Sequence, residues 1–161
     1  MLARVKLILL IDITILHRVL VMVKAVVIGR HRMLSKQLED LRRLGVDGFI
    51  QVPIIEEESI ADSVEEWARQ GARYIIVQAL PVNLLHKLYL EASRQGLDVL
   101  IARMDSIALV KSEEEAENLV KENPGARTFL RAKSGEAIRV VEFRGWEKIK
   151  QLHLELEPMT G

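Results

Sequence analysis

Three adjacent side chains that can bind an anion or move a proton are Arg30, His31 and Arg32. Guanidinium groups donate hydrogen bonds to phosphate or carboxylate oxygens, and an imidazole titrates near neutral pH, so this triplet suits anion binding or acid–base chemistry. The triplet follows an apolar run at residues 23–28. A helix predicted to begin near Ser35 would add backbone N–H donors and partial positive charge behind Arg32.

Further polar side chains follow two other apolar runs, at residues 74–78 and 98–102. If these runs are parallel strands, their carboxyl ends share one edge of a sheet, where open α/β folds bind ligands. We therefore predict a positive crevice for a phosphate, a nucleotide or another small anion. The predicted ligand-binding residues are Arg30, His31, Arg32, Gln78, Asn83, Arg103 and Asp105.

Other interpretations of the same residues remain open. The arginines can instead lie on the surface and form ion pairs with the acidic run at residues 56–58 or with Asp105. A phosphoester hydrolase or nuclease would use His31 and Asp105 as acid–base or metal groups, although no paired carboxylates follow the strands. A structural or interaction protein would pair exposed strands between subunits, at residues 5–16 or 152–157. The sequence leaves open whether the protein is an enzyme and which cofactor it uses.

Several known catalytic and cofactor motifs are missing from the chain. Neither a G-x-G-x-x-G nor a G-x-x-x-x-G-K-[ST] pattern occurs, which disfavours a classical dinucleotide oxidoreductase and a P-loop enzyme. The absence of cysteine excludes disulfides, thiolate metal sites and cysteine nucleophiles. The four histidines lack the i, i+2 or i, i+4 spacing of paired metal ligands, so we expect no metal site.

The elements that position these residues are indicated by glycines that recur at intervals of about 25–29 residues: Gly45, Gly71, Gly96 and Gly125. Glycine is common just after a helix, and a short aliphatic run follows each of these four. Repeated helix–strand units build a parallel sheet covered by helices. The predicted fold is a three-layer α/β domain, Rossmann-like or flavodoxin-like, with a mostly parallel sheet and a C-terminal antiparallel β appendix.

Hydrophobic periodicity and turn residues give approximate boundaries for the elements. We predict strands at residues 23–28, 48–52, 74–78 and 98–102, with a short further strand at 107–110. Helices are predicted over residues 35–44, 59–70 and 81–95 and from Ser112 onward, with capping boxes at Ser59 and Ser112. A β-hairpin is predicted from residues 128–132 and 137–143, followed by a last strand at 152–157.

Three regions of the chain follow from these elements. Residues 1–21 form an N-terminal apolar extension or an extra edge strand, residues 22–125 the α/β core domain, and residues 126–161 a β-hairpin and final strand packed on the core. Charged residues interrupt the apolar N-terminal segment, so we expect neither a membrane-spanning helix nor a signal peptide.

The amino-acid composition and net charge limit the kinds of partner that we expect for this protein. The chain has 161 residues, 49% of them hydrophobic, and a formal net charge of zero, which suits one domain with a substantial core. Neutral charge does not support nucleic acid or a membrane as partner. Scarce Asn, abundant charge and many aliphatic residues are typical of an intracellular thermophile protein, so we expect a cytoplasmic location. We separately expect a homodimer, and a sensor or regulatory role for the predicted ligand site.

Overall fold

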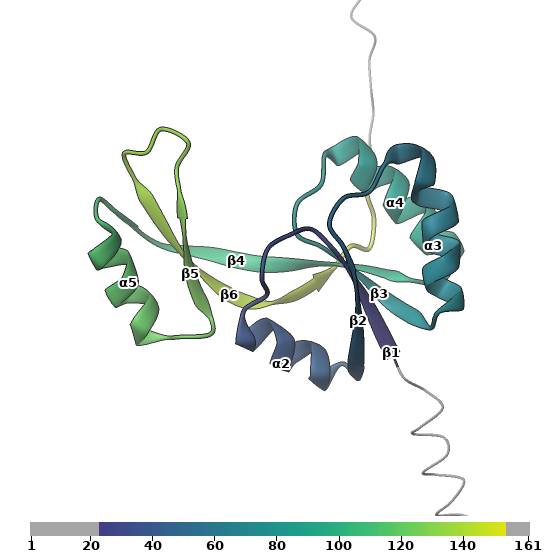
Figure 1. Ribbon diagram of the computed structural model, residues 1–161, viewed down its shortest axis with the longest axis horizontal. Coiled ribbons are helices and arrows are strands. Elements are labelled where there is room, and N and C mark those ends of the chain that lie inside the picture. Colours follow the sequence, from purple (N-terminus) through teal and green to yellow (C-terminus); the bar gives the residue numbers. More distant parts are fainter. Residues whose placement is uncertain (1–22, 154–161) are drawn as a thin grey trace, which may run out of the picture.

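The computed structural model describes residues 23–153. Its strands are β1 (Val23–Ile28), β2 (Val46–Val52), β3 (Ala72–Val77), β4 (Asp98–Val110), β5 (Arg127–Arg131) and β6 (Ile138–Lys148). Its helices are α2 (Ser35–Arg43), α3 (Ile60–Arg69), α4 (Val82–Arg94) and α5 (Glu113–Glu122), with a 3-10 turn at Glu57–Ser59. Figure 1 shows how these elements are arranged.

All six strands belong to one sheet, in the order β2-β1-β3-β4-β6-β5. The pairs among β2, β1, β3 and β4 are parallel, whereas β6 runs antiparallel to both β4 and β5. This confirms the predicted α/β class, with its mostly parallel sheet and C-terminal antiparallel strands. The hairpin predicted near residues 128–143 is the pair of β5 and β6.

The strand order reverses at β1. From β1 the chain passes first to β2 on one side and then to β3 on the other, so Ile28 at the end of β1 lies between Val52 and Val77. Such a reversal leaves a crevice beyond the carboxyl ends of the two strands, here β1 and β3, and open α/β sheets bind ligands there. The predicted polar loops after these strands therefore do share one edge of the sheet.

Hydrophobic clusters on both faces of the sheet create three layers, because alternate residues of a buried strand point to opposite sides. On one face α3 and α4 cover the inner strands, and Trp67 is buried there as part of the core. On the other face α2 contributes the buried Leu41 against Ala25, Val27 and Ile76. Apolar side chains on both faces of the sheet are thus removed from contact with water, which is the main contribution to the stability of the folded domain.

The strand β4 is longer than the sequence indicated. Residues 98–102 and 107–110 were expected as separate strands, but Asp98–Val110 is continuous. Its pairing with β6 shifts register between Arg103 and Met104 and again between Ser106 and Ala108. Bulges of this kind absorb an extra residue and bend a strand without ending it. The polar residues between the two apolar runs therefore do not interrupt the ladder.

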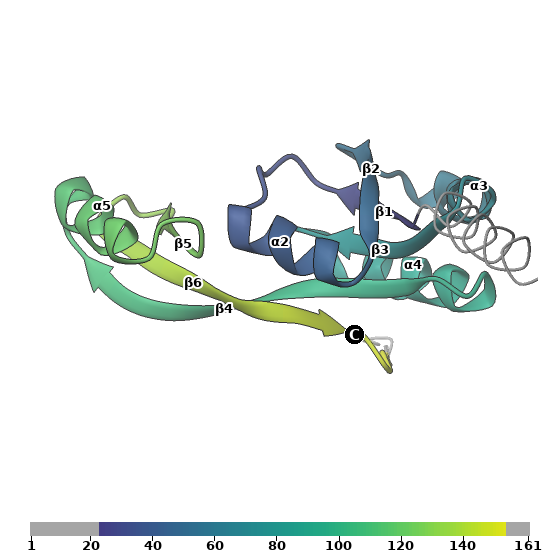
Figure 2. The same ribbon diagram turned by 90° about the horizontal axis from the view of Figure 1, so that it is seen from below.

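The far part of the β4–β6 ribbon, with α5 and β5, forms what we call the arm (residues 104–143). Figure 2 shows β4 and β6 running together from the core to the end that carries α5. Inside the arm, Ala116 of α5 packs against Ile138 and Val140 of β6 in a cluster of its own. The Lys36 N–H of α2 donates to the Gly125 carbonyl (3.0 Å), which joins the arm to the core.

The two predicted capping boxes have different outcomes. The Ser112 hydroxyl accepts a hydrogen bond from the Glu115 N–H (3.2 Å), as expected for the first residue before α5. The cap at Ser59 is wrong, because Ser59 ends a 3-10 turn with near-helical angles (φ −92°, ψ −6°) and its hydroxyl donates to the Glu56 carbonyl. An N-cap side chain needs extended backbone to reach the helix N–H groups.

Some predictions concern the chain ends. The extension at residues 1–21 lies outside the described residues, as does most of the last predicted strand at 152–157. Of that strand, Leu152 and His153 are described, and they are not in a β-strand. Among the helices of residues 23–153, none has the length and apolar character needed to cross a membrane.

Candidate functional site

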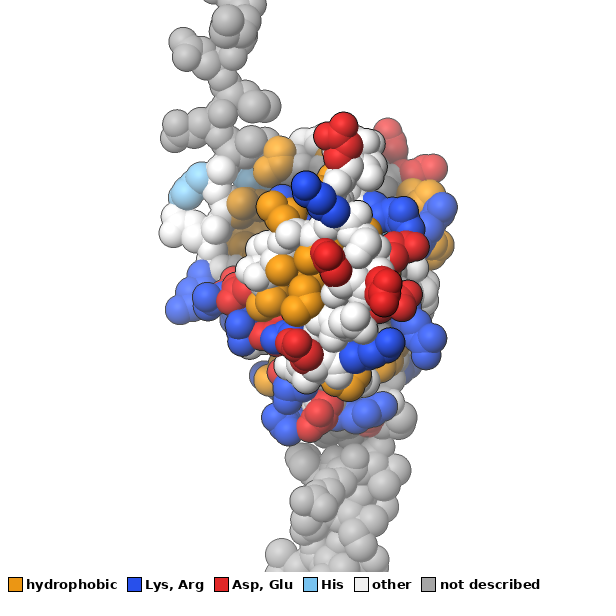
Figure 3. Space-filling view, turned by 90° about the vertical axis from the view of Figure 1, so that its left-hand side faces the viewer, with side chains coloured by type: hydrophobic (Ala, Val, Ile, Leu, Met, Phe, Trp, Pro, Cys, Tyr) orange, Lys and Arg blue, Asp and Glu red, His pale blue; other side chains and the backbone are white. Residues whose placement is uncertain are grey.

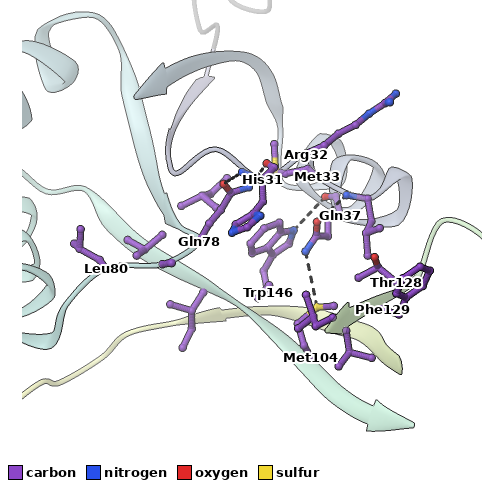
Figure 4. A pocket seen from close by; sticks show the side chains of 18 of the residues that line it. His31, Arg32, Met33, Gln37, Gln78, Leu80, Met104, Thr128, Phe129 and Trp146 are labelled. Atoms are coloured by element: carbon purple, nitrogen blue, oxygen red, sulfur yellow. Dashed lines mark hydrogen bonds between the residues drawn. The ribbon is translucent and has the colours of Figure 1, made fainter. Parts of the chain in front are cut away.

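An open groove of about 660 Å³ lies at the carboxyl ends of β1 and β3, between the core and the arm. Small-molecule sites typically enclose roughly 300–1,000 Å³, so the groove has a suitable size. Its walls come from the loop after β1, the start of α2, the loop after β3, α4, β4, β5 and β6. The groove is lined by residues 31–34, 37, 76–80, 85, 101, 102, 104, 128–130, 141 and 146. Figure 4 shows it from close by.

Three of the seven predicted ligand-binding residues line the groove, namely His31, Arg32 and Gln78. Arg30 belongs to the same loop and is exposed, but it does not line the groove. Asn83 is also exposed, in the first turn of α4, and lies outside the lining. The structure thus brings together part of the predicted set.

Arg103 and Asp105 of β4 are directed to ion pairs outside the groove. Arg103 Nε lies 3.4 Å from Asp105 Oδ1, and Arg144 Nε lies 3.1 Å from Asp105 Oδ2. The flanking Ala102 and Met104 line the groove, whereas these charged side chains do not. For Arg103 the structure therefore matches the alternative interpretation, in which arginines pair with surface carboxylates.

Gln78 supports the loop that carries Arg32. Its side-chain oxygen accepts a hydrogen bond from the His31 N–H (3.0 Å), and its Nε2 donates to the His31 carbonyl (2.6 Å). From the other side, Gln51 Nε2 donates to the Gly29 carbonyl (2.7 Å). Two glutamines therefore hold the main chain of this loop, Gln51 in β2 and Gln78 directly after β3. The Gln78 amide is a positioning group, since its donor and acceptor both bind protein backbone.

Gly29 makes this arrangement possible. Its φ is +140°, in a region that residues with a Cβ rarely adopt. A Cβ at this position would collide with Gln78, lying 2.8 Å from the Gln78 Cβ and closer still to its side-chain oxygen. The absence of a side chain at Gly29 lets the Gln78 amide pass beside the loop and reach His31.

A second set of hydrogen bonds links α2 to the ribbon. Gln37 Oε1 accepts from the Leu34 N–H (2.8 Å), and Trp146 Nε1 donates to the Gln37 carbonyl (3.1 Å). Gln37 Nε2 also lies 4.0 Å from the Met104 sulfur. Trp146 was not among the predicted site residues, because nothing in its sequence neighbourhood indicates periodicity. It reaches the groove through the pairing of β6 with β4.

Few polar groups in the groove are left without a partner. Within residues 23–153, the side chains of His31, Arg32 and Thr128 form no hydrogen bond or ion pair. Among residues 23–153, no acidic residue lines the groove. Arg32 is therefore the one permanently charged residue of the described lining, which favours an anion. It is exposed, and in Figure 4 its side chain extends outward, away from the Trp146 ring. Part of the expected contribution from the α2 N-terminus is already used, because the Lys36 N–H binds Gly125.

Behind the groove, a buried carboxylate stabilises the arm. Glu142 of β6 accepts hydrogen bonds from Arg127 Nε (2.8 Å) and Asn123 Nδ2 (3.0 Å). The Arg127 hydrogen bond, together with that of Asn123, lowers the pKa of the Glu142 carboxyl below its usual value. The same bond with Glu142 raises the pKa of Arg127. These contacts join β5 and β6 to the C-terminal end of α5, next to the groove residue Val141.

Metal ligands are not gathered here. In the part of the chain that the structure describes, no three His, Asp or Glu side chains lie together in a way that could hold a metal ion. His86 is half-buried on α4 and His153 is exposed, and neither lines the groove.

Comparison with known proteins gives a partial similarity. The sequence matches no protein-family model. Over 64 residues it is 41% identical to the indole-3-glycerol phosphate synthase of Bacillus velezensis. That match covers 37% of this chain and 26% of the enzyme, so the aligned part spans about a quarter of the length of this curated relative. Since the match covers only this part of the enzyme, it does not show that this chain has the enzyme's activity.

Proposed function

We propose that this chain is a ligand-binding domain, of sensor or regulatory type, that takes a small anionic ligand such as a nucleotide in the groove. One observation carries the proposal. Arg32 lies at the rim of a cavity of ligand size, at the reversal of strand order, where it is exposed to solvent. Among residues 23–153 it has no ion-pair partner and no acidic residue lines the cavity.

The chemistry of the lining supports an anion over a cation. An arginine can donate two parallel hydrogen bonds to a phosphate or carboxylate, and such charge-assisted bonds are stronger than neutral ones. Residues such as Leu80 and Ile101 supply apolar walls to the groove, whereas Arg32 at its rim is exposed to solvent. His31, at the same rim, can donate a further hydrogen bond from a ring N–H.

The alternative functions have less support. For a hydrolase, His31 and Asp105 would have to act on one substrate, yet Asp105 binds Arg103 and Arg144 and does not line the groove. A nucleic-acid partner would require a basic surface. Figure 3 instead shows positive and negative side chains interspersed on the arm end of the molecule. The homodimer, the thermophilic source and the cytoplasmic location stay predictions.

Isothermal titration against AMP, GMP and cyclic AMP tests the proposal. Hydrogen bonds to a charged group contribute about 1.5–3 kcal/mol, so Arg32→Ala should weaken binding by roughly 10- to 100-fold. Arg42→Ala is the matched control, because Arg42 is an exposed arginine on α2 outside the groove. It should leave the affinity unchanged.

Arg30→Ala separates two explanations of any Arg32 effect. If the groove binds the anion, Arg30→Ala has a small effect, since Arg30 does not line it. An equal loss in the Arg30 and Arg32 variants would mean that the charge of the whole loop attracts the ligand, as the sequence alone suggested. No measurable binding by the unaltered protein to any of the three nucleotides would refute the proposal.

A further inference from the structure

The floor of the groove is aromatic and thioether surface. Trp146 and Phe129 line it together with Met33 and Met104. In Figure 4 the Trp146 ring stands at the centre of the groove, with His31 above it and Met104 and Phe129 on the arm side. A bare phosphate or carboxylate gains nothing from such a floor, whereas a flat ring gains contact with polarizable sulfur and π surface.

The Trp146 ring is held in one orientation before any ligand binds. Its Nε1 donates to the Gln37 carbonyl (3.1 Å), and Phe143 packs against it edge-on, with ring centroids 5.4 Å apart and planes at 61°. Since its only polar group is already bonded, Trp146 can offer a ligand nothing but ring surface. A ring fixed in this way loses little entropy when another ring packs on it.

The remaining polar groups are too few to read the edge of a base. The amides of Gln37 and Gln78 could pair with a base edge, but both already bind protein groups. Among the polar side chains that line the groove, those of His31, Arg32 and Thr128 alone have no partner within residues 23–153. An imidazole and a hydroxyl each provide single hydrogen bonds, so neither forms the paired contact that separates adenine from guanine.

We propose that the groove binds an aromatic anion, in which a flat ring packs against Trp146 and the two methionines while the negative group meets Arg32, and that the ring is recognised by contact rather than by base-specific hydrogen bonds. This inference rests on the proposed function of the groove. It predicts affinity that depends on ring area and on negative charge, and that is nearly the same for different purine bases.

The experiment compares four probes that divide the ligand into its parts. AMP and GMP carry both ring and phosphate, ribose 5-phosphate lacks the ring, and adenosine lacks the phosphate. The chain has two tryptophans, and Trp67 belongs to the core cluster under α3, away from the groove. A Trp67→Phe variant therefore makes Trp146 the sole tryptophan, so its fluorescence reports a ring packed against it.

The expected results follow from the contacts. AMP and GMP should bind within about threefold of each other and change the Trp146 emission. Ribose 5-phosphate and adenosine should each bind at least tenfold more weakly than AMP. Met33→Ala removes apolar contact surface from the groove and leaves its charge unchanged, because Met33 is an uncharged, half-buried residue of the lining. It should weaken AMP severalfold and leave ribose 5-phosphate unchanged, and circular dichroism checks that each variant folds.

Other outcomes separate this inference from the proposed function. If ribose 5-phosphate binds as tightly as AMP and both depend on Arg32, the groove binds anions but the aromatic part of the inference is overturned. A preference above tenfold for one purine overturns recognition by contact alone. If AMP binds without any change in Trp146 emission, the ring does not pack there and the inference fails. If none of the four probes binds, both the inference and the proposed function are refuted.

Discussion

Replacing Gly29 by alanine tests the structural basis of the site, because this residue lets Gln78 hold the loop that carries Arg32. Gly29 has a φ of +140°, and a Cβ there would collide with the Gln78 side chain. Gln78 forms two hydrogen bonds to the His31 main chain, of 3.0 and 2.6 Å. The Gly29→Ala variant must therefore bear backbone strain and also displace Gln78 from those bonds.

The expected loss of unfolding free energy has two parts. A residue with a Cβ in a glycine-only region of backbone space costs about 1–3 kcal/mol. Loss of the two hydrogen bonds adds about 1–2 kcal/mol to the loss of unfolding free energy. Each bond is assigned a net contribution of about 0.5–1 kcal/mol, because the bonded groups are exposed to water. Gly29→Ala should thus destabilise the protein by about 2–5 kcal/mol, and Gln78→Ala alone by about 1–2 kcal/mol.

A double-mutant cycle measured by urea denaturation, followed by circular dichroism, checks this reasoning. In the Gln78→Ala background the hydrogen bonds are already gone, so adding Gly29→Ala should cost about 1–2 kcal/mol less than it does alone. The Gln78 Cβ remains 2.8 Å from the new methyl group, so part of the cost persists. Strictly additive effects would show that the two residues do not interact and would refute the reasoning.

Two further predictions concern the arm and the helix starts. Ser112→Ala should lower the unfolding free energy by about 1 kcal/mol in thermal denaturation, because its hydroxyl caps α5, whereas Ser59→Ala should cost less than about 0.5 kcal/mol, since it caps no helix. The stabilisation from Glu142, whose pKa is lowered in the folded state, is fully present above the ordinary carboxyl pKa near 4.5 and is lost as the pH falls through the lower folded value. Stability measured against pH should therefore fall in acid for the unaltered protein and be flatter in that range for Glu142→Gln, and identical profiles would rule out this role.

The core of the fold could be predicted because its signals are local. The run at β1 (Val23–Ile28) is apolar and β-branched and ends at a glycine, and its predicted and observed bounds agree. Gly45, Gly71 and Gly96 have positive φ directly after α2, α3 and α4. Each of these features is decided within a few residues of sequence, so periodicity and backbone preference are sufficient.

The continuity of β4 could not be predicted in the same way. Arg103 and Asp105 lie between its two apolar runs and resemble a loop in the sequence. They remain in the strand because β6, about forty residues later in the chain, supplies the paired backbone and ion-pair partners such as Arg144. A long-range partner therefore overrides the local preference.

The residues of the candidate site likewise fall into those that the sequence could predict and those that depend on long-range pairing. His31, Arg32 and Gln78 were identifiable because strand ends in a parallel sheet share an edge, which is a rule of topology. Trp146 was not identifiable, since its place at the groove depends on the register of β6 and on the bend of the ribbon. The role of Gln78 was also hidden, because the sequence does not show that its amide binds the loop.

The central claim is that a small anion binds in the groove at Arg32, between the core and the arm. The most direct test is a titration of the isotopically labelled protein with AMP, followed by NMR of the backbone amides and the Trp146 indole. We predict the largest shifts at His31 in the loop after β1 and at Ala102, Thr128 and Trp146 in β4, β5 and β6. Shifts confined to a surface away from these residues, or no shifts at millimolar AMP, would contradict the claim.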